Sequence, residues 1–160
     1  MEQAVYFNAR LLLNMVRPDQ NLFYNACTKC NRKVIDSSGS FYCEGCSQTY
    51  ETCSKRYILS ATAMDSTGEA WVSAFTEQAE QILGLGADAM SELKENNDVE
   101  FKRVLREAMW KPYVVRLQAK VTEYQNKKRQ RINIASLHAV DYAAENKLLL
   151  EQIVTVKRET

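Results

Sequence analysis

The sequence has little that would place it in a membrane or among the common classes of enzyme. No uninterrupted apolar stretch approaches the roughly 18 residues that cross a bilayer, and the N-terminus has no charged segment followed by an apolar one. His138 is the single histidine, and the motifs His-Glu-x-x-His, Gly-x-x-x-x-Gly-Lys and Gly-x-Ser-x-Gly are missing. We therefore expect a chain without a membrane span, without an export signal and without an active site.

The size and composition are those of an ordinary globular domain. The chain has 160 residues, of which 46% are hydrophobic and 26% are charged. This length allows one compact domain, or one domain with a small insert, and the composition excludes a disordered tail or a fibrous repeat.

The charge is divided unevenly along the chain. The net charge is only +1, but residues 1–100 carry 8 basic and 14 acidic side chains, whereas residues 101–160 carry 13 basic and 6 acidic ones. A concentrated positive region can attract a polyanion even when the whole molecule is almost neutral. A solvated face balanced by acidic neighbours is the alternative interpretation.

The cysteines form the most specific motif in the sequence. Four of the five occur as two Cys-x-x-Cys pairs, Cys27 with Cys30 and Cys43 with Cys46. Two such turns supply the four thiolates of a tetrahedral structural zinc site. The residues between the pairs, with Ser-Ser-Gly-Ser at 37–40, are typical of a short hairpin, so we predict a zinc ribbon at about residues 24–54.

Two other interpretations of the cysteines are a disulfide pair and a thioredoxin-like redox motif. The odd number of cysteines and the absence of a leader disfavour the first, and the lack of a flanking βαβ pattern disfavours the second. Because four thiolates leave no open position on zinc, we expect Zn²⁺ to be structural and Cys53 to be a free or packed thiol.

Five segments alternate apolar and polar residues as strands do. They are residues 5–16, 57–64, 71–75, 113–122 and 131–137. Between the third and the fourth, Phe101 begins a helical apolar stripe, with Asp98 placed to cap the helix. This order is that of an OB-fold, a five-stranded barrel with helices. We expect the barrel to occupy residues 1–140, with the zinc ribbon inserted between its first two strands.

Basic residues gather near the last two of these strands. Arg116 and Lys120 lie on the outward side of the fourth segment, and Lys127, Lys128 and Arg129 fall in the expected loop 125–130. A positive groove of this kind can follow a nucleic-acid backbone. A solvated strand face remains the alternative.

The C-terminal residues 141–158 are predicted to form an amphipathic helix capped by Asp141. One stripe contains Tyr142, Asn146, Leu149, Leu150, Ile153 and Val156. The stripe can pack across the end of the barrel, or it can join helices of other chains as an oligomerisation helix.

The whole chain resembles the C-terminal DNA-binding domain of the replication protein A large subunit. The matching residues are 6–16, 24–27, 30–36 (Cys-Asn-Arg-Lys-Val-Ile-Asp), 42–46 (Tyr-Cys-Glu-Gly-Cys), 56–60 (Arg-Tyr-Ile-Leu-Ser), 71–72, 82–84, 121–124 and 140–142. In this sequence the first cysteine pair is more closely spaced than in that family.

The resemblance implies a nuclear protein that binds single-stranded DNA without strong sequence preference, in DNA replication, repair and recombination. It also implies that the last helix assembles with a middle and a small subunit into a heterotrimer. The stacking aromatic residues of the family fall at Phe75 and Tyr124, although Phe75 can equally be a core residue. Two alternatives stay open: a paralogue of the large subunit that serves telomeres or telomerase, and a structural interaction module that binds no DNA.

Overall fold

A computed structural model describes residues 4–124 and 127–159, and within them all side chains except those of residues 122–128 and 159. The elements in chain order are β1 (Val5–Val16), β2 (Phe23–Ala26), β3 (Ile35–Ser37), β4 (Ser40–Cys43), β5 (Gln48–Tyr50), β6 (Ser54–Met64), β7 (Glu69–Phe75), α1 (Thr76–Leu83), α2 (Ala87–Asn96), α3 (Asp98–Glu107), β8 (Pro112–Tyr124), β9 (Lys127–Ala139) and α4 (Tyr142–Glu159).

Five strands close into a barrel. Their order is β1-β8-β9-β7-β6, and β6 pairs again with β1, while β2 adds to β6 outside the ring. The β7–β9 pair is parallel, and the other pairs of the ring are antiparallel. The predicted fold class, an OB-fold barrel with an inserted cysteine-rich unit and a C-terminal helix, is confirmed.

The first strand shows how the barrel core is built. Leu11 and Leu13 are buried, as alternation predicts, but the pairing with β6 shifts register between Leu13 and Met15. Because a bulge of this kind inserts one extra residue, the side chains beyond it change face. Met15 is therefore 38% exposed and Val16 is buried, whereas strict alternation would place Met15 inside with Leu13.

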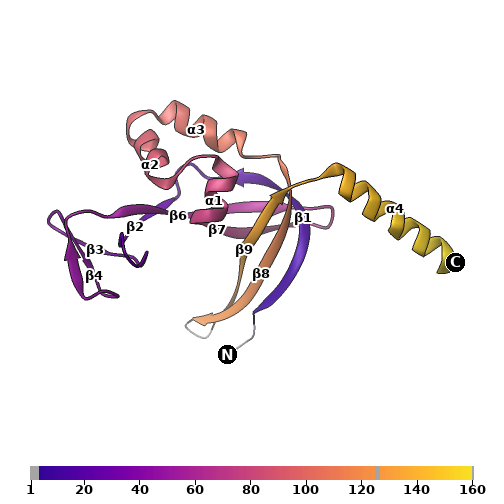
Figure 1. Ribbon diagram of the computed structural model, residues 1–160, viewed down its shortest axis with the longest axis horizontal. Coiled ribbons are helices and arrows are strands. Elements are labelled where there is room, and N and C mark those ends of the chain that lie inside the picture. Colours follow the sequence, from indigo (N-terminus) through magenta and orange to yellow (C-terminus); the bar gives the residue numbers. More distant parts are fainter. Residues whose placement is uncertain (1–3, 125–126, 160) are drawn as a thin grey trace.

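Helices α1, α2 and α3 lie together at one side of the barrel and contribute to its core (Figure 1). Helix α1 ends at Gly84, whose φ of 74° suits a residue without a side chain. In α3, Phe101 is buried in the common core as predicted. The cap prediction was wrong by one residue, because Asn97 accepts the hydrogen bond from the backbone N–H of Glu100 and Asp98 is already helical.

Leu13 offers a direct test of the barrel core. It is 1% exposed in the main buried cluster, so Leu13→Ala should lower the free energy of unfolding by about 2–5 kcal/mol. The matched control is Leu150→Ala on α4, where the side chain is 64% exposed and we expect little change. Chemical denaturation measures both, and equal effects of the two substitutions would contradict this assignment of the core.

The cysteine-rich insert forms a unit of its own. Strands β3, β4 and β5 make a separate three-stranded sheet beside the barrel (Figure 1). Its small core contains Cys27, Val34 and Cys43, and shares no buried residue with the barrel core. The predicted hairpin between the two cysteine pairs is present as β3 and β4.

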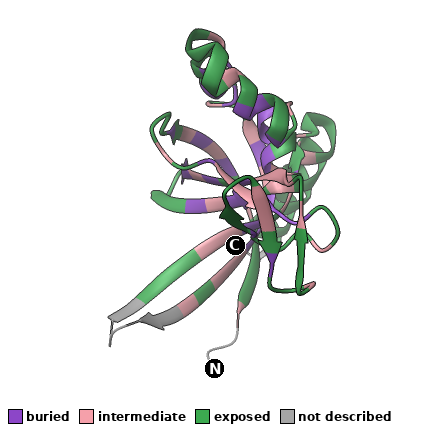
Figure 2. Cartoon of the chain, turned by 90° about the vertical axis from the view of Figure 1, so that its left-hand side faces the viewer, coloured by how far each residue is buried: buried purple, intermediate pink, exposed green. Residues whose placement is uncertain are grey.

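Strands β8 and β9 form a long hairpin that extends beyond the buried part of the barrel (Figures 1 and 2). The sequence analysis placed residues 125–130 in a loop, but β9 already begins at Lys127, which pairs with Tyr124. The basic residues from Lys127 onward therefore lie on a strand, because the ladder between the two strands continues as far as the pair of Tyr124 with Lys127.

Helix α4 projects away from the barrel (Figure 1). Asp141 caps it as predicted, since its Oδ1 accepts hydrogen bonds from the backbone N–H groups of Ala143 and Ala144 at 3.0 and 3.1 Å. Neither α4 nor any other helix in the described part of the chain has the length and hydropathy required to cross a bilayer.

Candidate metal centre and nucleic-acid interface

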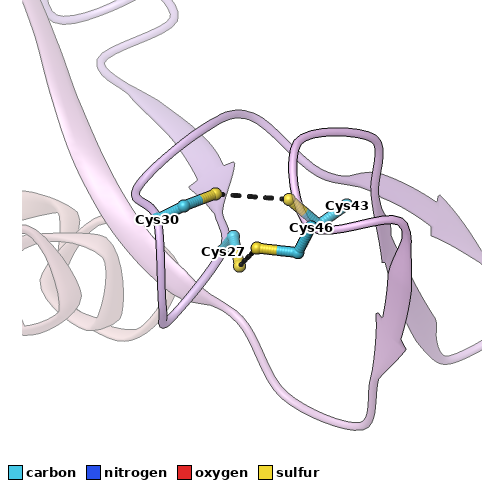
Figure 3. A group of neighbouring side chains, drawn as sticks. All are labelled: Cys27, Cys30, Cys43 and Cys46. Atoms are coloured by element: carbon cyan, nitrogen blue, oxygen red, sulfur yellow. Dashed lines mark hydrogen bonds between the residues drawn. The ribbon is translucent and has the colours of Figure 1, made fainter.

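The structure brings together the four cysteine sulfur atoms that were predicted as metal ligands. Cys30 Sγ lies 3.4 Å from Cys43 Sγ, and Cys27 Sγ lies 3.9 Å from Cys46 Sγ (Figure 3). All four sulfur atoms lie within 4.8 Å of one another. Since a disulfide bond needs about 2.05 Å, these cysteines are free, and together they can hold one metal ion.

Two tight turns aim these sulfur atoms at one point. Cys27 follows β2, and its carbonyl accepts a hydrogen bond from the N–H of Asn31, which has a positive φ of 59°. Cys43 ends β4, and the second turn passes through Gly45. A Cβ at Gly45 would lie 2.5 Å from Cδ of Arg32, so the side chain of Arg32 lies directly against this turn and would have to shift to admit any other residue here.

The surroundings of the sulfur atoms favour a thiolate at Cys27. The backbone N–H of Cys30, with a smaller contribution from that of Lys29, lowers the pKa of the Cys27 thiol to about 6. Burial raises the pKa of Cys43. Cys53 lies outside the cluster of four, and burial raises its pKa as well, which keeps it a neutral thiol.

The outer face of β7 carries exposed aromatic side chains. Phe75 is 44% exposed, so it is not a core residue, and it lies directly opposite Ile58 on β6. Trp71 is 49% exposed, and the guanidinium of Arg17 lies 5.1 Å from the centre of its ring. The same face therefore presents two aromatic rings to solvent.

A hollow of about 360 Å³ lies beside Trp71. Its lining comprises Arg17, Gln20, Asn21, Ile58, Ser60 and Trp71. The side-chain amide of Gln20 is fixed there, because it donates to the Ser60 carbonyl at 2.8 Å and accepts from the Ser60 N–H at 2.9 Å. The hollow therefore has the Trp71 ring and the Ile58 side chain beside fixed polar groups.

The predicted basic residues lie on strands β8 and β9. Arg116, Lys120 and Arg129 are exposed. Arg116 lies over the ring of Tyr6 on β1, 5.2 Å from its centre. Tyr124, Lys127 and Lys128 have strand backbone, and their side chains lie outside the described residues.

Every residue of the predicted helical stripe on α4 is exposed. The members are Tyr142, Asn146, Leu149, Leu150, Ile153 and Val156. Glu145 forms an ion pair with Arg10 of β1, so the start of the helix is tied to the barrel while its apolar stripe faces solvent. The interpretation that this stripe packs across the barrel does not fit this exposure.

Residues 6–149 match the family described as "Replication factor-A C terminal domain". The chain belongs to this family. It is 42% identical over 155 residues to a "Replication protein A 70 kDa DNA-binding subunit" of Arabidopsis thaliana, covering 95% of this chain and 25% of that protein. The "Replication factor A protein 1" of Schizosaccharomyces pombe is 31% identical over 154 residues, again covering 95% of this chain and 25% of the relative.

Solved structures of similar chains support the assignment. A chain of a replication protein A heterotrimer bound to ssDNA has a TM-score of 0.85 and 34% identity, covering 96% of this chain and 36% of that one. A chain of yeast RPA bound to ssDNA has a TM-score of 0.83 and 30% identity, covering 94% of this chain and 86% of that one. The present replication factor-A C-terminal domain thus spans about a quarter of the length of the curated relatives it matches.

The sequence analysis did not single out two residues at this domain's aromatic face. Trp71 was placed in a strand without a binding role, and Arg17 was not considered. The available signal was the alternation in β7, where Val72 and Ala74 are buried and the residues between them point outward. Arg17 could not be found in this way, because its position over Trp71 depends on the pairing of distant strands.

Proposed function

We propose that this domain binds single-stranded DNA as the C-terminal part of a replication protein A large subunit, in DNA replication, repair and recombination. The observation that carries the proposal is the exposure of Trp71 and Phe75 on β7, next to the strongly basic strand β9. Single-strand binding needs both parts, because every base has a face that can stack and every nucleotide carries a phosphate. The binding role also agrees with the expectation that the chain is not an enzyme.

The relatives support this proposal. The Arabidopsis relative is named a DNA-binding subunit, and both similar structures are described as bound to ssDNA. In the proposed complex, bases stack on Trp71, Phe75 and Tyr124, while the cations of β8 and β9 contact phosphates. The cations would be Arg116, Lys120, Lys127, Lys128 and Arg129.

We propose that the four-cysteine cluster holds a structural Zn²⁺. Zinc bound to four thiolates at about 2.3 Å places neighbouring sulfur atoms about 3.8 Å apart. The observed separations of 3.4 and 3.9 Å agree with that geometry, and four sulfur donors without histidine or carboxylate are a set that zinc prefers. The metal would fasten the two turns together and leave no open position for catalysis.

We further propose that residues 1–140, including the insert at about 24–54, form the DNA-binding unit, and that α4 assembles with the middle and small subunits of the same complex. The exposed apolar stripe of α4 supports this role. The relatives are replication proteins, which supports a nuclear location.

Trp71→Ala tests the aromatic face. The loss of one base stack should weaken binding to fluorescently labelled oligothymidine by about tenfold, since each stack contributes about 1–3 kcal/mol. The matched control is Trp110→Ala, because Trp110 is 61% exposed but lies between α3 and β8, outside the aromatic face. Fluorescence anisotropy measures both affinities.

The proposed function fails if wild-type protein shows no salt-sensitive binding to oligothymidine, and such a result would favour a structural module without DNA binding. Equal loss from Trp71→Ala and Trp110→Ala would remove Trp71 from the interface. Competition between G-rich telomeric repeats and mixed sequence tests the telomere-dedicated alternative, which requires a preference for the repeats.

A further inference from the structure

Positive charge on the barrel is concentrated on three neighbouring strands. Strands β1, β8 and β9 together contain 7 Lys or Arg residues and 1 acidic residue, Glu123. Helices α1, α2 and α3 contain 8 acidic and 4 basic residues. The outer face of β1 and β8 is a second region, separated from the aromatic face of β7 by strand β9. Three of the seven cations lie on β1 and β8, and four lie on β9, which pairs with both β8 and β7.

Tyr6 on β1 is held in place on this second region. The side-chain amide of Gln118 donates a hydrogen bond to its hydroxyl, and the guanidinium of Arg116 lies over its ring. Tyr6 is nevertheless 50% exposed. A half-exposed aromatic ring fixed by two neighbouring polar groups resembles a stacking platform more than a core residue.

Two cations next to this platform face each other across the hairpin. Lys120 on β8 pairs directly with Arg131 on β9, and both are exposed. Like charges directly opposite each other in a sheet are destabilising. No acidic side chain in the described part of the chain forms an ion pair with either, so a bound anion would relieve this repulsion.

The two regions are connected by a row of polar residues across four strands. Ser73 of β7 pairs with Asn133 of β9, which pairs with Gln118 of β8, which in turn pairs with Tyr6 of β1. Residues paired in a sheet share a face, so this row runs around the outside of the barrel from the aromatic strand to Tyr6.

We propose that the outer face of β1 and β8, with Tyr6, Arg116, Gln118 and Lys120, is a second contact surface for single-stranded nucleic acid. A strand bound on the aromatic face of β7 continues across Arg131 and Asn133 of β9 and reaches Tyr6. This inference rests on the proposed function and extends the bound strand beyond the β6–β7 face.

The chemistry of this surface favours a nucleic-acid strand over an acidic peptide. Its cations are interleaved with a tyrosine ring and side-chain amides, and these groups suit the alternating phosphates and bases of a single strand. An acidic peptide requires only the cations.

The test compares two lengths of oligothymidine in the intact domain, about 8 and about 30 nucleotides, since one OB-fold covers about 4–16. Tyr6→Ala should bind the long strand about tenfold more weakly, for one lost stack, and the short strand within about twofold of wild type. Arg116→Ala should make the salt dependence on the long strand shallower by about 0.7 in log–log slope, for one lost phosphate contact. Arg106→Ala, an exposed arginine of α3, is the charge-matched control and should change neither affinity.

Several outcomes separate this inference from the function on which it rests. If Tyr6→Ala binds the long strand with wild-type affinity, the second contact surface is wrong while the proposed function stands. An equal loss on both strands places these residues in a single site and also overturns it. Failure of wild type to bind either strand overturns both proposals.

A polyglutamate peptide tests the alternative partner. If the variants keep their affinity for the long strand but bind the peptide more weakly than wild type, the face belongs to an acidic protein segment instead. Arg116→Lys, which keeps the charge but not the guanidinium, should weaken long-strand binding less than Arg116→Ala, and unchanged thermal unfolding confirms that each variant is folded.

Discussion

Cys43→Ser should release the metal and unfold the ribbon. Wild-type protein is expected to carry about one zinc per chain, and the variant none, because a hydroxyl is a poor replacement for one of four thiolates. The cost is large, since zinc contributes about 10–16 kcal/mol of apparent binding free energy in small structural sites at neutral pH. Elemental analysis after gel filtration measures the zinc content directly.

The barrel should remain folded in this variant. Cys43 belongs to the small core with Cys27 and Val34, and this core is separate from the buried cluster of the barrel. Amide hydrogen exchange should therefore become fast across residues 27–50 and stay slow in β1. DNA affinity is read in the same preparation, which shows how much of it depends on the ribbon.

Cys53→Ser is the matched control for this experiment. It makes the same chemical change in the same unit, but Cys53 lies outside the group of four sulfur atoms. The control should keep its zinc. The ligand assignment is wrong if wild type contains no zinc, or if both variants lose metal to the same extent.

Leu149→Glu combined with Ile153→Glu should abolish assembly with the middle and small subunits. The two side chains are 42% and 51% exposed and lie one helical turn apart on α4. Two carboxylates buried in a helix–helix contact would lose their hydration without a partner, so we expect the apparent affinity for the other subunits to fall by about a hundredfold or more. Co-purification of the three subunits, followed by light scattering, measures the complex.

DNA binding by the isolated domain should not change in this variant. Glutamate is a good helix former, so α4 should persist, and its described ion pair with the barrel is made by Glu145 in the first turn, which is unchanged in this variant. Lys147→Glu, on the polar side of the same helix, is the control and should keep the complex. Assembly that survives the double substitution would exclude the apolar stripe as the contact.

The four-cysteine cluster and the capped terminal helix were accessible from sequence because their signals are local. Each Cys-x-x-Cys pair lies within a single turn, and Asp141 reaches N–H groups only two and three residues away. The alternation in β1, β6, β7 and β8 also predicted strands and faces, because successive side chains of a strand point to opposite sides. The order of strands and helices then predicted the barrel class.

The tertiary structure alone decided which faces meet. The parallel contact of β7 with β9, the shift in register after Leu13 and the position of Arg17 over Trp71 all join residues far apart in sequence. The alternation of apolar and polar residues along a strand assigns each residue to a face of the sheet, but it does not identify the neighbouring strand. It also does not reveal a bulge, in which one extra residue is inserted into a strand. The residues determined the strands, the cysteine pairs and the terminal helix. Barrel closure determined which aromatic and basic side chains became neighbours and left the apolar stripe of that helix exposed, since those contacts depend on pairing between distant segments.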